Sequence, residues 1–367
     1  MKGLNPGKIR IVQLLESLKY GDAVGNDCLA IHRTLTEAGY DAAIFAANID
    51  SRVQEMRING VKFLERYADN ADIILCHIAY KWDFLLRLDK LRGKKIFVWH
   101  NITPPRLLEE YGDFESAAGC RKGLEQAKQI HTTPSLCLTP SEYNKAELSK
   151  LGYRCPIHTL PILTDLKNEE NFDQDLFARY KDDGFVNVLF VGRISPNKRQ
   201  QDIISAFYHY NKNINQKSRL FIVGGGNEDS AYCMALKEYP SVIRLDDVIF
   251  TGHVSDRQKT TYYKLADVFL CMSEHEGFCV PLLEAMHYKV PVIAYDSSAV
   301  TETLGGAGLL LKSKKPALVA EAIDRVIQDK RLRTTLIENG TERLRDFSEE
   351  KVKASLLKEI SEFIKES

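Results

Sequence analysis

The stretch SEHEGFCVPLLEAM, residues 273–286, decides the fold more than any other part of the chain. Residues 267–272 precede it, are apolar from Val268 onward and are typical of a buried β-strand. Pro281 suits the first position of a helix, where its missing N–H is not needed, and Gly277 lets the backbone approach a ligand closely. The stretch therefore predicts a strand that leads into a helix N-terminus, where free amides offer a seat for an anion.

Two carboxylates belong to this stretch. We expect Glu276 in the loop and Glu284 about one turn into the helix. Carboxylates that share one crevice suit the binding of hydroxyl groups or the stabilisation of developing charge. The alternative is a solvated Glu276 and a Glu284 that only faces the surface.

Short apolar runs recur along the chain and alternate with longer amphipathic segments. Many are continuous and β-branched, as expected for strands that are buried on both faces of a parallel sheet. The runs lie at residues 9–15, 41–47, 73–78, 95–100 and 135–139, and again at 188–191, 220–223, 248–250, 268–272, 290–294 and 308–311. This alternation predicts an α/β fold with doubly wound parallel sheets.

The pattern occurs twice, and a polar stretch at residues 165–183 interrupts it. We therefore predict two domains, residues 1–165 and residues 166–347, with the polar stretch as the linker. Residues 348–367 predict one further helix, because Ser348 is a suitable N-cap and apolar residues recur behind it at helical spacing. One face of this helix must be buried.

Composition excludes some classes of protein. Fifty basic residues balance fifty acidic ones, which argues against a general nucleic-acid binder. None of the eight cysteines forms a CxxC pair, so we expect buried, reduced thiols, with a zinc site or a disulfide framework as the alternative. The N-terminus does not resemble a signal peptide, and no apolar run approaches the roughly 20 residues that span a bilayer. We expect a soluble, cytoplasmic protein that is at most attached to the inner face of a membrane.

A second motif, VGRISPNKR at residues 191–199, follows the first strand of the second half and precedes a helix. Arg193 offers a planar fork for phosphate oxygens, and Lys198 offers a mobile point charge. Such cations in a loop of a neutral protein favour a localised diphosphate site. The alternative is an exposed basic turn.

Four weaker motifs remain. The glycines at 224–226 do not form a GxGxxG fingerprint, and a tight strand-to-helix turn explains them at least as well. Residues 21–27 form a glycine-containing segment that either opens space for a ligand or is an ordinary loop with a helix cap. His100 ends a strand, where a lone histidine is usually structural. The basic stretch 87–95 is either a solvated face or a contact for anionic lipid.

Together these segments resemble the family 4 retaining glycosyltransferases, most densely over residues 188–311. The resemblance rests on FVGR at 190–193 with Lys198, FIVGGG at 221–226, FTGHV at 250–254, EGF at 276–278 through EAM at 284–286, and PVIA at 291–294. The spacing of Glu276 and Glu284 matches the E-x7-E element of that family. The match is looser in the first half, because residues 21–26 lack the paired glycines that are common in the family.

The resemblance implies a GT-B fold, in which two Rossmann-like domains face a central cleft and the helix at 348–367 crosses back onto the first domain. It implies that Arg193 and Lys198 bind the donor diphosphate, that Glu276 lies beside the transferred sugar, and that Glu284 binds the nucleotide ribose. The implied catalytic residues are Glu276, His100, Arg193 and Lys198, and the implied donor-binding residues are Arg193, Lys198, Gly277, Phe278, Cys279, Val280, Glu284 and Gly25.

The implied function is transfer of a hexosyl-type sugar from a nucleoside-diphosphate sugar to an acceptor hydroxyl, with retention at the anomeric carbon. The setting would be assembly of a cell-surface polysaccharide or a lipid-linked saccharide. The expected partners are a nucleotide-sugar donor, a saccharide or lipid-linked saccharide acceptor, and a membrane surface contacted peripherally, but no nucleic acid. No metal or other cofactor is expected, because no Asp-x-Asp element ends a strand and fixed cations supply the positive charge.

Three alternative functions stay open. One is a sugar-nucleotide epimerase of the same fold, which would need a donor but no acceptor. Another is an NAD-dependent Rossmann enzyme, which would need a GxGxxG turn with an acidic residue about 20 residues further on. The third is a non-catalytic subunit that binds a sugar nucleotide.

Overall fold

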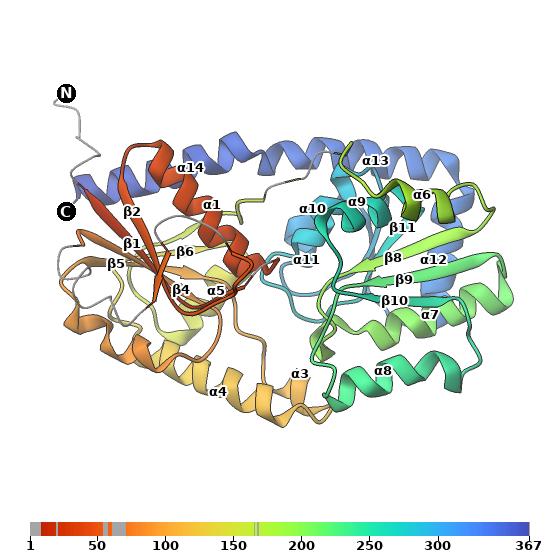
Figure 1. Cartoon of the computed structure of the whole chain (residues 1–367), viewed down its shortest axis with the longest axis horizontal. Coiled ribbons are helices and arrows are strands. Elements are labelled where there is room, and N and C mark those ends of the chain that lie inside the picture. Colours follow the sequence, from red (N-terminus) through yellow and green to blue (C-terminus); the bar gives the residue numbers. More distant parts are fainter. Residues whose placement is uncertain are drawn as a thin grey trace. The chain divides into compact units, whose positions relative to one another are not determined.

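The computed structural model describes residues 9–19, 21–53, 58–60, 71–164, 166 and 169–366. The chain forms two compact units, which are described separately (Figure 1). The first unit comprises Met1–Ile102, Ala118–Asp165 and Phe347–Ser367, and the second comprises Thr103–Ala117 and Leu166–Asp346. Residue 165, where the sequence predicts the domain boundary and the start of the linker, lies outside the described residues, as does the predicted helix end at residue 367.

The first unit contains a seven-stranded sheet in the order β3-β2-β1-β4-β5-β6-β7, with every described pair of neighbours parallel. Its strands are β1 (Arg10–Leu18), β2 (Asp41–Ile49), β3 (Ile58–Gly60), β4 (Ile73–Ile78), β5 (Lys94–Trp99), β6 (Leu136–Thr139) and β7 (Ile157–Thr159). Its helices are α1 (Ala23–Glu37), the 3-10 helix η3 (Asp83–Lys90), most of α4 (Phe114–Gln129), α5 (Glu142–Leu151) and α14 (Glu349–Lys365).

The helix α14 completes the core of the first unit. Val352, Leu356 and Ile360 are buried, and they pack in one apolar cluster with α1 and with strands β1, β4, β5 and β6. Ser348 accepts a hydrogen bond from the amide of Lys351 and so caps the helix, as the sequence predicts. Burial of one such aliphatic side chain stabilises a fold by roughly 1.5–3 kcal/mol. The core of the first unit therefore depends on residues that follow the whole second unit along the chain.

The second unit contains a six-stranded sheet in the order β10-β9-β8-β11-β12-β13, again with parallel neighbours. Its strands are β8 (Val186–Val191), β9 (Ser218–Val223), β10 (Val248–Gly252), β11 (Val268–Cys271), β12 (Val292–Tyr295) and β13 (Leu309–Leu311). Its helices are α3 (Arg106–Glu109), α6 (Gln174–Tyr180), η4 (Pro196–Lys198), α7 (Gln200–Asn213), α8 (Ala231–Val242), α9 (Asp256–Leu265), α10 (Val280–His287), α11 (Val300–Leu304), α12 (Pro316–Gln328), α13 (Lys330–Leu344) and η5 (Arg345–Phe347), which ends at the boundary of the unit. No helix among the described residues of the chain is both long enough and apolar enough to cross a membrane.

Successive side chains of the central strands enter two different cores. Val188 and Phe190 pack with α7, α8 and α12, whereas Leu189 and Val191 pack with α9, α10 and α11 on the other face of the sheet. Because both faces are covered by helices, the strand reads as a continuous apolar run rather than an alternating one. Each predicted run overlaps a strand of the structure, and the short edge strands β3 and β7 are the additions.

The order of strands reverses once in each sheet. From β8 the chain adds β9 and β10 on one side, and then β11, β12 and β13 on the other, so that β8 and β11 are neighbours at the reversal. In the first sheet, β1 and β4 are the corresponding neighbours. Open α/β sheets bind ligands beyond the carboxyl ends of the strands at such a switch point. The loops that follow β8 and β11 are therefore the places to look for a ligand site in the second unit.

Residues 103–117 depart from the predicted domain division, which assigned them to the first domain. They pack with the second unit. The ring of Tyr111 meets the ring of Tyr232 edge to face, with 5.4 Å between centroids, and the guanidinium of Arg199 lies 5.3 Å from the Tyr111 centroid. The side-chain amide of Gln201 also donates to the Tyr111 hydroxyl at 2.9 Å. Aromatic and cation–π contacts of this kind leave no periodic pattern in a sequence, so the prediction had no signal for them.

Candidate active site

The loop between β11 and α10 carries Glu276, and neighbouring side chains hold its backbone in place. The amide of Glu276 donates to Ser298 Oγ at 2.8 Å. The hydroxyl of Thr303 donates to the carbonyl oxygen of Phe278 at 2.5 Å. Ser298 and Thr303, which follow β12, thus fix both ends of the EGF stretch. Their sequence pattern did not predict this role.

The chain enters α10 through a left-handed residue. Cys279, the N-cap, has φ 75° and ψ 64°, and Pro281 lies in the first turn as the sequence predicts. A residue with a Cβ in this conformation costs roughly 1–2 kcal/mol, whereas glycine adopts it freely. The turn directs the positive end of α10 toward the carboxyl edge of the sheet, where it favours an anion.

The structure brings together Lys198 and Glu276, which the sequence predicts to share a site. Their side chains form an ion pair, with 2.5 Å between Lys198 Nζ and Glu276 Oε2, and they are only 21% and 8% exposed. Burial acts to lower the pKa of Lys198, but the charge of Glu276, its hydrogen bond to Lys198 and the nearby Cys279 and Cys271 together raise that pKa above its ordinary value. The pair connects the loops that follow β8 and β11 across the switch point.

Arg193 lies in the same β8 loop with its backbone anchored and its side chain exposed. Its carbonyl oxygen accepts from Gln200 Nε2 at 2.9 Å. It forms no ion pair with any residue in the described ranges, so its charge is available to an anion. The nearby glycines 224–226 form a tight turn, because a Cβ on Gly224 would stand 2.2 Å from the carbonyl oxygen of Gly192. This favours the structural interpretation of the triple glycine over a ligand-binding one.

Glu284 has different partners from Glu276. Its Oε1 accepts from Lys259 Nζ at 2.6 Å, and its Oε2 accepts from the hydroxyl of Tyr263 at 2.8 Å. Burial acts to lower the pKa of Lys259, and the nearby Glu284 raises it on balance. The sequence did not indicate these two residues of α9, because only the tertiary fold brings that helix beside α10.

Gly25 lies inside a helix and not in a loop. The segment 21–27 was expected to precede a helix, but α1 already begins at Ala23. A Cβ on Gly25 would stand 2.6 Å from the carbonyl oxygen of Lys19, just after the preceding strand β1. The glycine is thus required by the close approach of backbone to backbone, and its predicted contact with a donor stays a prediction.

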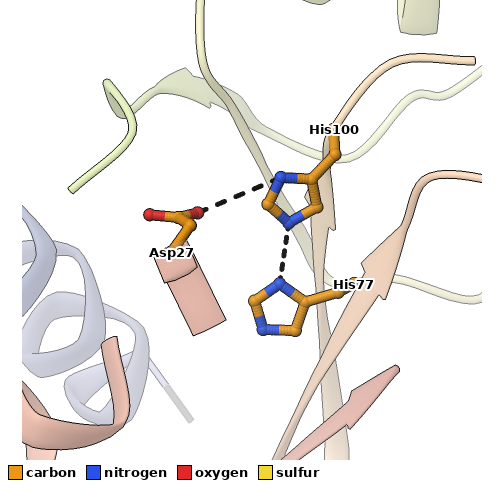
Figure 2. Close-up of side chains that lie close together, drawn as sticks. All are labelled: Asp27, His77 and His100. Atoms are coloured by element: carbon orange, nitrogen blue, oxygen red, sulfur yellow. Dashed lines mark hydrogen bonds and ion pairs between the residues drawn. The ribbon is translucent and has the colours of Figure 1, made fainter. Parts of the chain in front are cut away.

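His100 belongs to a buried chain of hydrogen bonds in the first unit. Figure 2 shows its ring between Asp27 and His77, with 2.8 Å from its Nε2 to His77 Nδ1 and 4.0 Å from its Nδ1 to Asp27 Oδ2. The chain continues from His77 Nε2 to Gln13 Oε1 at 2.9 Å. The His100 side chain is 2% exposed, so both of its ring nitrogens face protein atoms.

The direction of these hydrogen bonds follows from the far end of the chain. Gln13 Nε2 donates to the carbonyl of Cys28, so Gln13 Oε1 accepts from His77 Nε2. His77 Nδ1 then accepts from His100 Nε2, which leaves His100 Nδ1 without a proton and facing Asp27. The network thus assigns one neutral tautomer to each ring.

Burial sets where the next proton resides. It raises the pKa of Asp27 to about 7, although the amide of Leu163, which donates to Asp27 Oδ1, acts to lower it. Burial also lowers the pKa of His100 to about 4. The proton of this pair therefore belongs to the carboxyl group rather than to the imidazole. The sequence singled out His100 but missed Asp27 and His77, which lie far from it along the chain.

Comparison with known proteins finds one matching family model and several relatives. Residues 171–343 match the sequence model of the family described as "Glycosyl transferases group 1". The capsular polysaccharide biosynthesis glycosyltransferase CapM of Staphylococcus aureus is 27% identical over 203 residues, which cover 54% of this chain and 52% of that protein. O-antigen chain mannosyltransferase B of Escherichia coli is 25% identical over 260 residues, which cover 71% of this chain and 61% of that protein. The chain spans about half of the length of the first of these relatives and less than two thirds of the second.

Solved structures share the fold over nearly the whole chain. Sucrose-phosphate synthase from Thermosynechococcus elongatus superposes with a TM-score of 0.76 at 18% identity, covering 98% of this chain and 100% of that one. HepE from Anabaena, solved in complex with UDP-glucose, gives a TM-score of 0.77 at 17% identity over 96% of this chain and 100% of that one. At this level of identity the likeness shows the GT-B fold and not the substrate. Together the family match, the curated relatives and the shared fold support placing this chain in the GT-B glycosyltransferase superfamily.

Proposed function

We propose that this chain transfers a hexosyl-type sugar from a nucleoside-diphosphate sugar to an acceptor hydroxyl with retention of anomeric configuration. The acceptor would be a saccharide or a lipid-linked saccharide in the assembly of a cell-surface polysaccharide. The names of the matched relatives, which include capsular polysaccharide and O-antigen transferases, favour this setting. Retention rests on the resemblance to family 4 alone, whose E-x7-E element the spacing of Glu276 and Glu284 matches.

One observation carries the proposal: the buried ion pair of Lys198 with Glu276 at the switch point of the second sheet. A cation and an anion in direct contact suit a substrate that has a diphosphate next to a sugar. Lys198 Nζ can turn toward the phosphate oxygens, and Glu276 can then accept from the sugar hydroxyls that replace the ammonium. The pair thus holds each group ready for its ligand, and the two opposite charges offset each other.

The chemistry that follows is stabilisation of the leaving group. As the glycosidic bond breaks, negative charge grows on the diphosphate oxygen. Lys198, Arg193 and the N-terminus of α10 would offset this charge, and donors fixed in advance need no reorganisation during the reaction. These fixed cations take the role that a divalent metal has in enzymes with an Asp-x-Asp element, so we propose a metal-independent transfer. Glu284 would reach the nucleotide ribose after exchanging Lys259 or Tyr263 for a ribose hydroxyl.

The first unit would contact an anionic membrane surface through its basic stretch. Arg87, Lys90, Arg92 and Lys94 are exposed, and Leu86 beside them is 44% exposed. Lys95 contributes less, because it is half-buried and its Nζ donates to the carbonyl of Leu91. Each lysine or arginine near an anionic surface contributes roughly 1 kcal/mol of attraction.

A binding and transfer experiment tests the proposed function. Calorimetry with UDP, GDP, dTDP and ADP sugars should find one that binds, and Glu276→Gln should keep nucleotide affinity while it loses most of the turnover. Lys198→Ala should weaken donor binding, whereas Lys237→Ala, which breaks an ion pair with Glu228 on the outside of α8, serves as the matched control. Transfer should persist in excess EDTA, and NMR of the product's anomeric proton should show retention. Failure of all four sugars to bind would exclude the proposal.

A further inference from the structure

Two cysteines lie on either side of Glu276 in the folded chain. None of the eight cysteines, all of which lie within the described residues, forms a disulfide, and Cys271 and Cys279 are among the buried ones. Cys271 ends β11, Cys279 is the N-cap of α10, and Glu276 lies in the loop between them. One ligand atom from each of the three residues lies within 4.8 Å of the other two. The three are 2%, 8% and 7% exposed, so they form a compact buried group of donors.

The backbone of Cys279 provides a second, independent observation. Its φ of 75° belongs to the region that glycine adopts without strain and other residues adopt at a cost. Strained residues of this kind persist mainly at functional sites. A glycine would make the same turn with less strain, so the backbone conformation does not explain the cysteine. What the residue adds is its thiol, placed beside Cys271 and Glu276.

The donor set suits a thiophilic divalent ion. Zinc takes thiolate ligands at about 2.3 Å and carboxylate oxygens at about 2.0–2.2 Å, so tetrahedral ligand atoms lie roughly 3.3–3.8 Å from one another. The three ligand atoms, all within 4.8 Å of one another, would close to these separations around the ion. Two thiolates and one carboxylate carry three negative charges, and a divalent ion together with the ammonium of Lys198 balances them. Such neutrality matters in a buried site, where an uncompensated charge is costly.

We propose that Cys271, Glu276 and Cys279 bind one Zn²⁺ ion, and that the ion inhibits the enzyme by withdrawing Glu276 from Lys198. Both thiols release their protons to solvent as the metal–sulfur bonds form, and the fourth position is left to water. The inhibitory effect rests on the proposed function, whereas the metal site does not. The ion is an inhibitor and not a cofactor of transfer, so the two proposals are compatible.

Metal binding by the untagged, reduced protein tests the site directly. Equilibrium dialysis should find one tightly bound Zn²⁺ in the wild type, and Co²⁺ should give the thiolate-to-metal absorption of a sulfur-ligated ion. Loss of an outer-shell partner alone typically weakens metal affinity about 10–100-fold, so Cys271→Ala and Cys279→Gly should each weaken it about 100-fold or more. Cys279→Gly should fold well, because glycine fits the left-handed turn, and thermal unfolding checks this.

The matched control removes the other close pair of thiols. Cys137 Sγ and Cys155 Sγ lie 3.6 Å apart in the first unit, so Cys155→Ala should leave Zn²⁺ affinity unchanged. Undiminished binding by a folded Cys279→Gly variant, or loss of binding in Cys155→Ala, would overturn the assignment.

An activity assay then separates the two proposals. Stoichiometric Zn²⁺ should suppress sugar transfer by the wild type, and EDTA should restore it. The Cys271→Ala variant should change its own metal-free rate by less than about twofold when Zn²⁺ is added. Tight binding of Zn²⁺ by a protein that transfers no sugar would refute the proposed function but leave the proposed metal site standing. Transfer that bound zinc leaves untouched would refute the inhibition.

Discussion

Two single substitutions, Asp27→Asn and His100→Gln, should change the pH dependence of the free energy of unfolding in opposite directions. In the folded chain Asp27 has a pKa of about 7 and His100 a pKa of about 4, because both are buried. Between about pH 4.5 and 6 the folded pair therefore holds one proton, on Asp27. In the unfolded chain the ordinary values, 3.8 and 6.5, place one proton on the histidine instead. The folded and unfolded states hold equal numbers of protons on this pair, so the pair adds no pH dependence to the free energy of unfolding in this window.

Removing one member exposes the contribution of the other. The raised pKa of Asp27 lowers stability as pH rises from about 3.8 to about 7, because only the folded state keeps the proton there. The lowered pKa of His100 has the opposite effect, and stability is lost as pH falls from about 6.5 to about 4. One proton corresponds to about 1.4 kcal/mol per pH unit. Relative to wild type, the free energy of unfolding of His100→Gln should thus fall by about 2 kcal/mol from pH 4.5 to 6, and that of Asp27→Asn should rise by about 2 kcal/mol.

The assay is urea unfolding followed by tryptophan fluorescence at several pH values. The chain has two tryptophans, Trp82 and Trp99, and both lie in the first unit, so the signal reports on the unit that holds the pair. His77 and Cys28 face the same cluster and are present in all three proteins, and burial, the largest cause of the lowered pKa of His77 and of the raised pKa of Cys28, is common to all three. Either substitution lowers absolute stability by removing a polar partner, and the slope against pH is free of that offset. Parallel curves for the three proteins would refute the proton assignment.

Two further predictions concern ligand contacts. Arg193→Ala should weaken binding of the nucleoside diphosphate by about one to two decades, because a hydrogen bond to a charged group contributes roughly 1.5–3 kcal/mol; unchanged calorimetric affinity of a folded variant would remove Arg193 from the site. Arg92→Glu combined with Lys94→Glu should reduce sedimentation with anionic vesicles and leave sedimentation with neutral vesicles unchanged. A wild-type protein that does not sediment with anionic vesicles would contradict the membrane contact without affecting the enzyme assignment.

The strands were predictable because burial on both faces leaves a strong local signal. Runs such as 188–191 and 220–223 are apolar at every position, since neighbouring side chains enter separate cores. The strands β3 and β7 escaped prediction because three residues at the edge of a sheet are too few to show a pattern. The assignment of residues 103–117 failed for another reason, since it depends on the contacts of Tyr111 with groups about 90 residues away along the chain.

The site residues also fall into those that the local sequence predicts and those that only the tertiary fold reveals. Lys198 and Glu276 could be predicted to meet, because each follows a strand and adjacent strands of a parallel sheet end at one edge. The partners of Glu284 could not, because Lys259 and Tyr263 lie on a helix with no motif of its own. His100 was found through family resemblance, but the carboxyl group of Asp27 and its raised pKa are consequences of burial that only the folded chain reveals.

The position of α14 also has a consequence for synthesis of the protein. A ribosome makes residues 9–164 first, but these lack the side chains of Val352, Leu356 and Ile360 that complete their core. The second unit, which ends at residue 346, has all of its strands before that helix emerges. The first unit is therefore synthesised first but completed last. Its apolar surface stays uncovered while about 180 further residues are translated, at roughly 5–20 residues per second. A nascent chain halted before residue 349 should engage holding chaperones through its N-terminal half and not through the half just made.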